Sequence, residues 1–244
     1  MIITTAIIKG GTGKSTTAAA LAQAAASEKK SVLCIDLDPQ TNLSSMIGGD
    51  QRRAGTDKLL HGAAAEELIQ QTDQGISIIT GSPNLAVETT KPGSSRRLRQ
   101  AIQPIAGDYD LIVIDCPPSF GELVYLGIDA ADLLLIPLLS DAHSLQGLYQ
   151  IVDIADQIKA NDNHDLRIAG SVICRYDGRS KLHQFYRDTI ARIGNEIGAP
   201  LIGTIRSGVA VEEAQAYQRS LYDYAPKSKP AQDYRTLYKQ IFHA

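Results

Sequence analysis

The sequence lacks the features that mark several specialised classes of protein. It has no tryptophan, and only three cysteines and two methionines occur among its 244 residues. Its longest apolar stretches, such as Ala130–Leu139, are interrupted by charge and are too short to span a bilayer. The N-terminus has no basic region followed by an apolar block and a cleavage site, as a secretion signal would. These absences favour a cytoplasmic protein.

Paired cysteines are absent as well. Cys34, Cys116 and Cys174 are far apart, and each lies in an apolar, strand-like run. Neither these cysteines nor the five histidines have the spacing of metal ligands. We interpret the three thiols as buried and reduced, which fits a reducing cytoplasm.

No strong charge of one sign dominates the chain, but the charge is unevenly divided. Residues 165–244 hold 12 Lys and Arg against 8 Asp and Glu, a net charge of +4. Residues 1–164 hold 12 against 19, a net charge of −7, and the whole chain carries −3. A basic C-terminal third on an acidic body is suited to a polyanion, although solvated helix faces would give the same count.

Apolar runs and helix-like stretches alternate along the chain without a linker or an internal repeat. The expected strands are Met1–Ile8, Ser31–Leu37, Ile76–Thr80, Leu111–Asp115, Leu133–Leu138, Ile168–Cys174 and Leu201–Ile205. The expected helices are Lys14–Ala26, Ala64–Gln71, Ser95–Pro104, Leu145–Lys159, Leu182–Ile197 and Ala231–Phe242. This alternation predicts an α/β fold in which a mostly parallel twisted sheet is flanked by helices on both faces. We expect a single domain, residues 1–244, that binds ligands beyond the carboxyl ends of its strands.

A glycine-rich loop follows the first expected strand and opens the first helix. It reads Gly10-Gly11-Thr12-Gly13-Lys14-Ser15. The glycines let backbone N–H groups approach phosphate oxygens where a Cβ would clash, and the helix N-terminus adds partial positive charge. Lys14 is placed to reach the β- and γ-phosphates, and Ser15 to ligate Mg²⁺. The loop therefore predicts a P-loop nucleoside triphosphatase.

The loop departs from the usual pattern at one position. Four residues before Gly13, where that pattern has glycine, this chain has Lys9. A lysine ammonium is a mobile point charge on a long stem. We hypothesise that Lys9 reaches across a dimer interface to the nucleotide of the partner subunit. The alternative is a surface lysine beside the loop.

Three acidic residues end two of the expected strands at the same sheet edge. Asp36 and Asp38 end the second strand, and Asp115 ends "LIVID". One acid of the first pair is suited to hold a Mg²⁺-bound water and the other to orient the attacking water, while Asp115 has the position of a Walker B acid. Each acid also precedes a proline-containing turn, so a purely structural role is the alternative.

Together these motifs resemble the ParA family of partition ATPases, the DNA- and plasmid-segregation proteins related to MinD. The segment "KGGTGKSTTAAALA" is similar to the family's deviant Walker A motif, and "VLCIDLDPQTNLS" to its second motif. "YDLIVIDCPPSFGELVYLGIDAADLLLIPL" is similar to its Walker B region. "YDGRSKL" and "YAPKSKPAQDYRTL" are similar to its C-terminal blocks. Because the first strand begins at the N-terminus, we expect the small form without a helix-turn-helix domain.

The resemblance implies a cycle driven by ATP and Mg²⁺. ATP is expected to close a sandwich homodimer that binds DNA nonspecifically on the nucleoid, without a membrane. Slow hydrolysis, stimulated by a centromere-binding ParB-type partner, is expected to release it. The implied ATP-binding residues are Lys9, Gly10, Gly11, Thr12, Gly13, Lys14, Ser15 and Thr16, with Lys9, Lys14 and Asp38 catalytic and Ser15, Asp36 and Asp115 at the metal. The implied DNA-binding residues are Arg179, Arg206, Arg219, Lys227, Lys229 and Lys239.

One block of the chain departs from the family. The family's "IPRNVRLSEAP" reads "IRSGVAVEEAQ" here, so its two arginines fall on Ser207 and Ala210, with Arg206 as a candidate substitute. Three other functions stay open. A MinD-like membrane-cycling ATPase needs a basic amphipathic C-terminal helix, whereas this chain ends at "LYKQIFHA". The others are an ATPase that positions another cargo and a metabolic ATPase, whose relatives carry paired cysteines.

Overall fold

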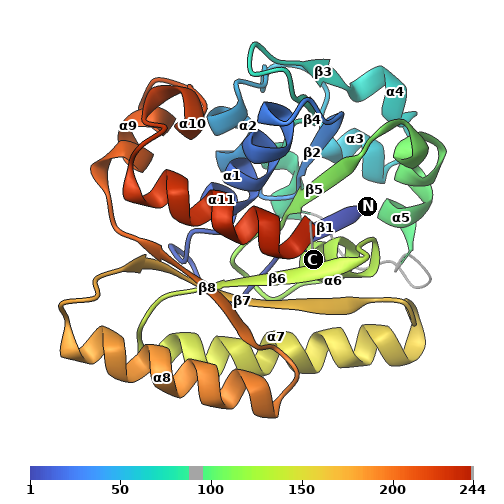
Figure 1. Cartoon of the computed structure of the whole chain (residues 1–244). Coiled ribbons are helices and arrows are strands. Elements are labelled where there is room, and N and C mark those ends of the chain that lie inside the picture. The colour runs from blue at the N-terminus through green and yellow to red at the C-terminus, as the bar shows by residue number, and fades with distance from the viewer. Residues whose placement is uncertain (88–95, 243–244) are drawn as a thin grey trace.

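The computed structural model describes residues 1–87 and 96–242. The eight strands within them form one sheet in the order β3-β4-β2-β5-β1-β6-β7-β8 (Figure 1). The strands are β1 (Ile2–Thr5), β2 (Val32–Asp36), β3 (Gln70–Gln71), β4 (Ser77–Ile79), β5 (Leu111–Asp115), β6 (Leu133–Leu138), β7 (Arg167–Tyr176) and β8 (Leu201–Arg206). Only the β3–β4 pair is antiparallel, so the carboxyl ends of the other strands share one edge.

Side chains of the central strands alternate between two apolar cores, one on each face of the sheet. Along β5, Ile112 and Ile114 lie in one core and Leu111 and Val113 in the other. Successive side chains of a strand point to opposite faces, so a strand buried on both sides must be apolar at every position. This explains why these strands are continuous apolar runs in the sequence.

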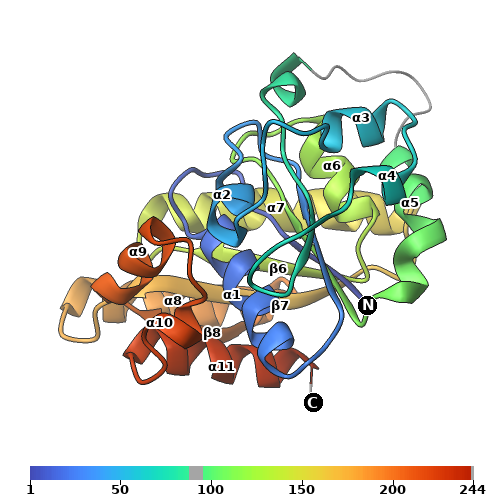
Figure 2. The same ribbon diagram turned by 90° about the horizontal axis from the view of Figure 1, so that it is seen from above.

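Helices cover both faces. The helices are α1 (Lys14–Ser27), α2 (Asn42–Ile47), α3 (Thr56–Leu60), α4 (Ala65–Leu68), α5 (Arg97–Ile102), α6 (Glu122–Asp129), α7 (Ala142–Asn161), α8 (Lys181–Glu196), α9 (Val209–Ala216), α10 (Leu221–Tyr224) and α11 (Lys229–Phe242), with 3₁₀ turns at Pro83–Val87 and Gln103–Asp108. The residues of α1, α2 and α9–α11 share one core, and those of α3–α8 share the other. Figures 1 and 2 show α11 and α7 on opposite sides of β6–β8.

Helix α1 carries the glycine loop into the centre of the molecule. Its residues Ala18–Ala25 are all buried, because it packs between the sheet, α2 and α11. Alanine has the highest helix propensity and a small volume, so an alanine-rich helix is stable there and packs closely on every side. The first turn of α1 is thereby fixed at the carboxyl edge of the sheet.

The predicted fold class is confirmed, and all seven expected strands are present, Leu111–Asp115 and Leu133–Leu138 with the expected bounds and the other five with shifted ones. The expected helix Ala64–Gln71 is wrong at its end. Helix α4 stops at Leu68, and Gln70–Gln71 form β3 instead, because Gln70 hydrogen-bonds the backbone of Asp50 and pairs with β4. The sequence analysis also missed the short helices α2, α3, α6, α9 and α10. Ser95, the first residue of another expected helix, and residues 243–244 lie outside the described residues.

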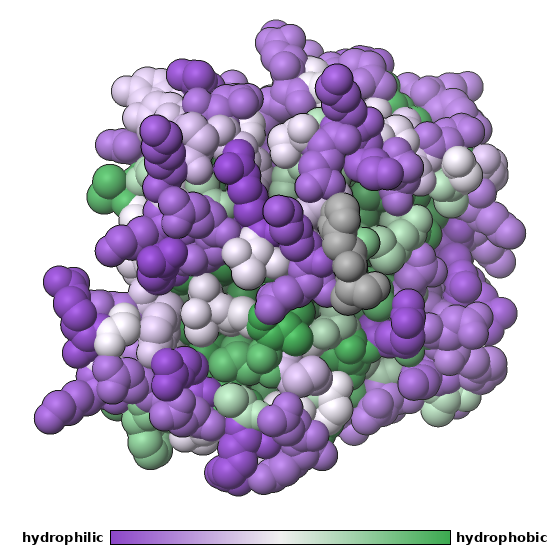
Figure 3. Space-filling model, in the orientation of Figure 1, coloured by the Kyte–Doolittle hydropathy of each residue, from purple (hydrophilic) through white to green (hydrophobic). Residues whose placement is uncertain are grey.

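The surface in the view of Figure 1 is mainly hydrophilic. Apolar side chains gather on it beneath α11, over β7 and β8 (Figure 3). Strand β8 is at the sheet edge, and Leu201, Ile202 and Thr204 in it are only half-buried. In residues 1–87 and 96–242, no helix combines the length and the apolar character needed to cross a membrane.

Candidate functional site

The glycine loop lies between β1 and α1 at the carboxyl edge of the sheet. Gly11 and Gly13 have φ angles of 73° and 93°, a left-handed conformation that side chains rarely adopt. A Cβ on Gly13 would lie 3.1 Å from the Cys174 sulfur at the end of β7. The loop therefore needs glycine at position 13 for two reasons, backbone conformation and close contact with the neighbouring strand.

Lys14 is the first residue of α1, and it is only 6% exposed. Its Nζ donates a hydrogen bond to the main-chain carbonyl of Lys9, at 2.9 Å. Burial lowers the pKa of Lys14 below its ordinary value, although the carboxylates of Asp115 and Asp38 act in the opposite direction. The lysine is thus held inside the loop, within the field of two acids.

Lys9 is held within its own subunit. Its Nζ lies 2.6 Å from Asp141 Oδ2 and 3.4 Å from Ser144 Oγ. Asp141 caps the N-terminus of α7, where its Oδ1 accepts a hydrogen bond from the Ser144 N–H at 2.8 Å. Burial tends to raise the pKa of Asp141, but the bonds from Lys9 and Ser144 outweigh it and hold the pKa below its usual value. The sequence analysis did not single out Asp141.

Asp36 and Asp115 are side by side at the ends of β2 and β5 and are fully buried. Asp36 accepts hydrogen bonds from the Asp38 N–H and from the N–H and hydroxyl of Ser44. Burial is the largest effect and raises the pKa of Asp36 to about 6. Burial, and then the nearby Asp36, raise the pKa of Asp115 well above its ordinary value. Two adjacent buried carboxylates favour a cation or proton between them.

Buried polar atoms beside these acids fit a hydrated magnesium ion. Asp115 Oδ2 and the Thr12 hydroxyl are buried without a hydrogen-bond partner in the described part of the chain, while Asp115 Oδ1 accepts from Thr5 at 3.2 Å. No three His, Cys, Asp or Glu side chains in that part form a complete metal site. Mg²⁺ usually keeps several waters and takes only one or two protein ligands together with substrate phosphates. The Ser15 hydroxyl and the two carboxylates provide such a partial set.

Asp38 follows β2 and is 4% exposed. Its Oδ1 accepts a hydrogen bond from the Gln40 N–H at 2.9 Å, and its backbone N–H donates to Asp36. Its carboxylate also acts on the ammonium of Lys14. The three acids and two lysines expected at one edge are therefore brought together there.

A pocket of about 320 Å³ opens beside the loop, and the sequence analysis missed its far wall. It is lined by residues of the loop, β7, β8, α9 and α11, namely Gly13, Thr16, Cys174, Arg175, Ile205, Arg206, Ser207, Gly208, Val209, Val211, Glu212, Gln215 and Tyr234. Arg175 has a left-handed φ of 53°, which is uncommon outside glycine and often marks a functional site. The sequence offered one signal for this wall of the pocket: the strands labelled β7 and β8 were also expected to end at the carboxyl edge of the sheet.

The six basic residues expected to bind DNA are spread over the C-terminal third. Arg179 precedes α8 and pairs with Asp177, and Arg219 lies with its guanidinium carbon 5.8 Å from the Tyr224 ring centre. Lys227, Lys229 and Lys239 are exposed, without an ion pair in the described residues. Lys239 is ten residues beyond Lys229 on α11, about 15 Å along the axis.

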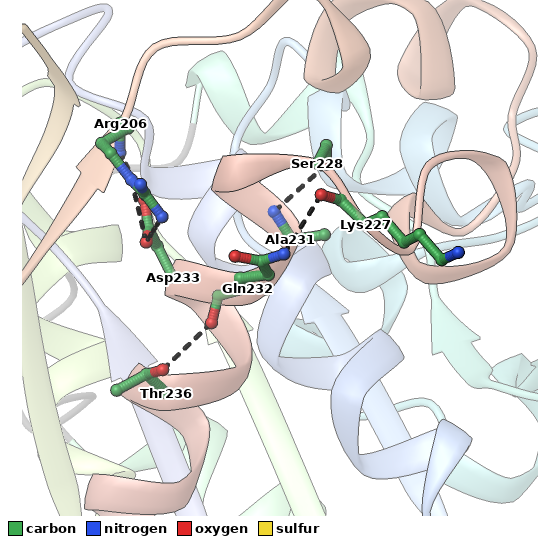
Figure 4. A network of polar contacts seen from close by, with 7 residues as sticks. All are labelled: Arg206, Lys227, Ser228, Ala231, Gln232, Asp233 and Thr236. Carbon is green, nitrogen blue, oxygen red and sulfur yellow. Dashed lines mark hydrogen bonds and ion pairs between the residues drawn. The ribbon is translucent and has the colours of Figure 1, made fainter.

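Arg206 differs from the other five, because its guanidinium binds a mostly buried acid of another element, Asp233 of α11 (Figure 4). Nε and Nη2 donate to both carboxylate oxygens at 2.6–3.2 Å, and the Arg206 backbone N–H donates to Oδ2 at 2.9 Å. The same close-up shows the Lys227 side chain extending away from the network, while its carbonyl accepts from Gln232. Arg206 ties the end of β8 to α11, so its charge is already balanced.

The fold and this edge define a class. The glycine loop joins the central strand β1 to the buried helix α1, with a lysine and a hydroxyl in the first turn of the helix and acids at the ends of β2 and β5. This arrangement is the site of a P-loop nucleotide-binding protein.

Comparison with known proteins narrows this class. A family model described as an AAA domain matches residues 1–168. The chain is 32% identical to the chromosome partitioning protein ParA of Myxococcus xanthus, over 96% of this chain and 84% of that protein. Among solved structures, a putative plasmid partition protein from Borrelia burgdorferi bound to AMPPNP superposes with a TM-score of 0.84 at 21% identity, covering 99% and 98% of the two chains. Cobyrinic acid a,c-diamide synthase from Mycobacterium smegmatis, with bound ATP analog and magnesium, has a TM-score of 0.81 at 25% identity, covering 98% and 92%.

The chain belongs to the ParA family of partition ATPases, as its motifs predicted.

Proposed function

We propose that this chain is a DNA-partition ATPase, which binds ATP with Mg²⁺, closes into a homodimer and then binds DNA without sequence preference. Hydrolysis, slow alone and stimulated by a ParB-type partner, ends the DNA-bound state. The observation that carries this proposal is the gathering of Lys9, Lys14, Asp36, Asp38 and Asp115 around one glycine loop. The family of the chain supports the choice of DNA partition over other uses of the same site.

Each side chain has a role that follows from its surroundings. Lys14 and the loop N–H groups neutralise and hold the phosphates, for which the N-terminus of α1 supplies partial positive charge. Ser15, Asp36 and Asp115 would hold a magnesium ion and its waters, and such an ion stabilises the charge that develops on the transferred phosphoryl group. Asp38, at the rim of the same edge, orients the attacking water. The pocket beyond Gly13 is of a size and position to take the base and sugar.

The proposed dimer places two glycine loops face to face. Phe120 lies in the loop after β5 at the same edge and is 73% exposed. Burial of Phe120 against the partner subunit would add apolar contact next to the nucleotide. Lys9 would then contact the nucleotide bound by the partner subunit.

For DNA, the proposal relies on the exposed cations of the C-terminal third. Lysine and arginine contacts to phosphates give sequence-independent affinity that falls as salt rises. Lys229 begins α11 and Lys227 lies two residues before it; both are exposed and have no ion pair in the described residues, so they are the strongest candidates. Arg206 is the weakest, because its pair with Asp233 is partly buried, whereas the pair of Arg179 with Asp177 is exposed.

The deciding experiment measures binding to random-sequence duplex DNA at two salt concentrations, with ADP and with a nonhydrolysable ATP analogue. We expect binding only with the analogue, weaker at the higher salt, and no binding by Lys14→Ala with either nucleotide. Equal binding with ADP and analogue would contradict ATP control. An analogue-dependent dimer that does not bind DNA but pellets with liposomes would favour membrane cycling. A dimer that binds neither DNA nor liposomes would favour another cargo.

A further inference from the structure

The side chain and the main chain of Lys9 are both bound by groups of the same subunit. Its N–H donates to the Ile7 carbonyl at 2.9 Å, its carbonyl accepts from Lys14, and its ammonium pairs with Asp141. The Lys9 side chain is only 21% exposed, so this pair is partly shielded from water. A lysine held in this way is not extended towards a partner.

Asp141 uses its two oxygens for two separate purposes. Oδ1 accepts from the Ser144 N–H and caps α7, whereas Oδ2 binds Lys9. A cap requires only one acceptor oxygen, and asparagine caps helices about as well as aspartate. The carboxylate charge and the second oxygen are therefore not needed for the helix, and what they contact is the ammonium of Lys9.

A carboxylate and a phosphate compete for the same ammonium. Both offer anionic oxygens at hydrogen-bond distance, and a lysine binds either one as a point charge. Lys9 cannot bind Asp141 in its own subunit and a nucleotide in the partner subunit at the same time if the two are far apart. The free energy of the internal pair then opposes dimer formation.

We propose that Asp141 is a positioning residue that retains Lys9 in its own subunit and so weakens the ATP-dependent dimer. This inference rests on the proposed function, because it assumes that Lys9 acts across the dimer. It assigns Asp141 a regulatory effect: only a nucleotide-loaded partner provides enough negative charge to take Lys9 from Asp141. The chain thereby avoids dimers that lack nucleotide.

The test replaces Asp141 with asparagine, which keeps the Oδ1 cap and presents an amide donor to Lys9 in place of an anion. The dimer dissociation constant is measured by sedimentation with a nonhydrolysable ATP analogue. Charge-assisted hydrogen bonds of this kind support an expected tightening of about tenfold, which corresponds to about 1.4 kcal/mol. Asp156→Asn is the matched control, because Asp156 is exposed on the same helix, fifteen residues and about 22 Å away.

A second readout tests the contact itself without a dimer. Labelling of the ligand-free protein with an amine-reactive reagent, followed by peptide mass spectrometry, reports access to the Lys9 ammonium. We expect Lys9 to react faster in Asp141→Asn than in the wild type, with unchanged labelling in Asp156→Asn. Melting temperatures equal to that of the wild type would show that the cap is intact.

The outcomes separate the two proposals. A wild-type protein that never dimerises with the analogue would refute the proposed function, and labelling would then decide whether Asp141 holds Lys9. A wild-type dimer that is unchanged or weakened in Asp141→Asn would overturn the positioning role, whatever the labelling. A weakened dimer would mean that Asp141 itself contributes to the interface. In the variant Lys9→Ala with Asp141→Asn, the gain must disappear, because Asp141 acts only through Lys9.

Discussion

The contact between Arg206 and Asp233 should contribute to stability and not to DNA binding. Removing the guanidinium in Arg206→Ala breaks the contacts to both oxygens of Asp233, a side chain that is only 15% exposed. Breaking a buried pair costs roughly 3–5 kcal/mol and breaking an exposed one about 0–1 kcal/mol. Because Arg206 is 42% exposed, solvent screening reduces the effect, and we expect a loss of about 1–2 kcal/mol.

For a chain of this length, that loss corresponds to a fall in melting temperature of roughly 2–8 °C. Calorimetry or thermal circular dichroism measures it directly. DNA binding needs a variant that preserves net charge, since Arg206→Ala alone leaves Asp233 unbalanced. Arg206→Gln combined with Asp233→Asn meets this need, and the double variant should keep the salt dependence of the wild type.

Lys229→Ala is the comparison, because that cation has no acidic partner in the described residues. Each phosphate contact contributes about 0.9 to the slope of log affinity against log salt. We expect Lys229→Ala to lower the slope by about this amount. The reasoning would be refuted if the charge-neutral double variant lost that slope, or if Arg206→Ala melted like the wild type.

Three further changes test the site and the core. Lys14→Ala should abolish ATP binding, and an isothermal titration with the usual heat would contradict the loop assignment. Asp38→Ala should bind ATP and dimerise but release phosphate at a rate lower by about 100-fold, the scale of a lost acid–base or positioning group, whereas full turnover would remove its proposed role. Burial raises the pKa of Asp129 more than Arg99 lowers it, and Asp162 raises it further, so the folded state binds its proton more tightly than the unfolded chain. The protonated Asp129 therefore makes its full contribution to the free energy of unfolding below about pH 4, and this contribution is lost as pH rises through the raised pKa. Chemical denaturation as a function of pH should show that Asp129→Asn lacks this decline in stability.

Local chemistry made part of this molecule predictable from the sequence. The loop, Asp36 and Asp115 are found because glycine, lysine and terminal acids at fixed spacing have few other uses, and because long apolar runs predict buried strands. Helices α9 and α10 are short, and tertiary contacts stabilise them more than their own propensity does. Strand β3 has only two residues and exists because β4 is beside it. Such elements have no periodic pattern to detect.

Pairings between distant residues were the harder part of the site. Lys9 and Asp141 are 132 positions apart, and Arg206 and Asp233 are 27 apart, so sequence spacing carries no sign of either contact. Judged by charge alone, Arg206 and Lys229 were equally good candidates for contacts with DNA. Only the partner distinguishes them, and a partner is a property of the folded chain.

Lys9 contacts both the other lysine of the loop and the cap of α7. Its carbonyl binds the Lys14 ammonium, and its own ammonium binds Asp141. Phosphates that attract Lys14 would compete with the Lys9 carbonyl, so nucleotide binding would remove one of the four contacts that hold Lys9 in place. Among the contacts that remain, the ion pair with Asp141 is partly exposed, which favours its exchange for a phosphate. In the proposed dimer, the nucleotide of one subunit would loosen the lysine that its partner's nucleotide must recruit, which would make two bound nucleotides more effective than one.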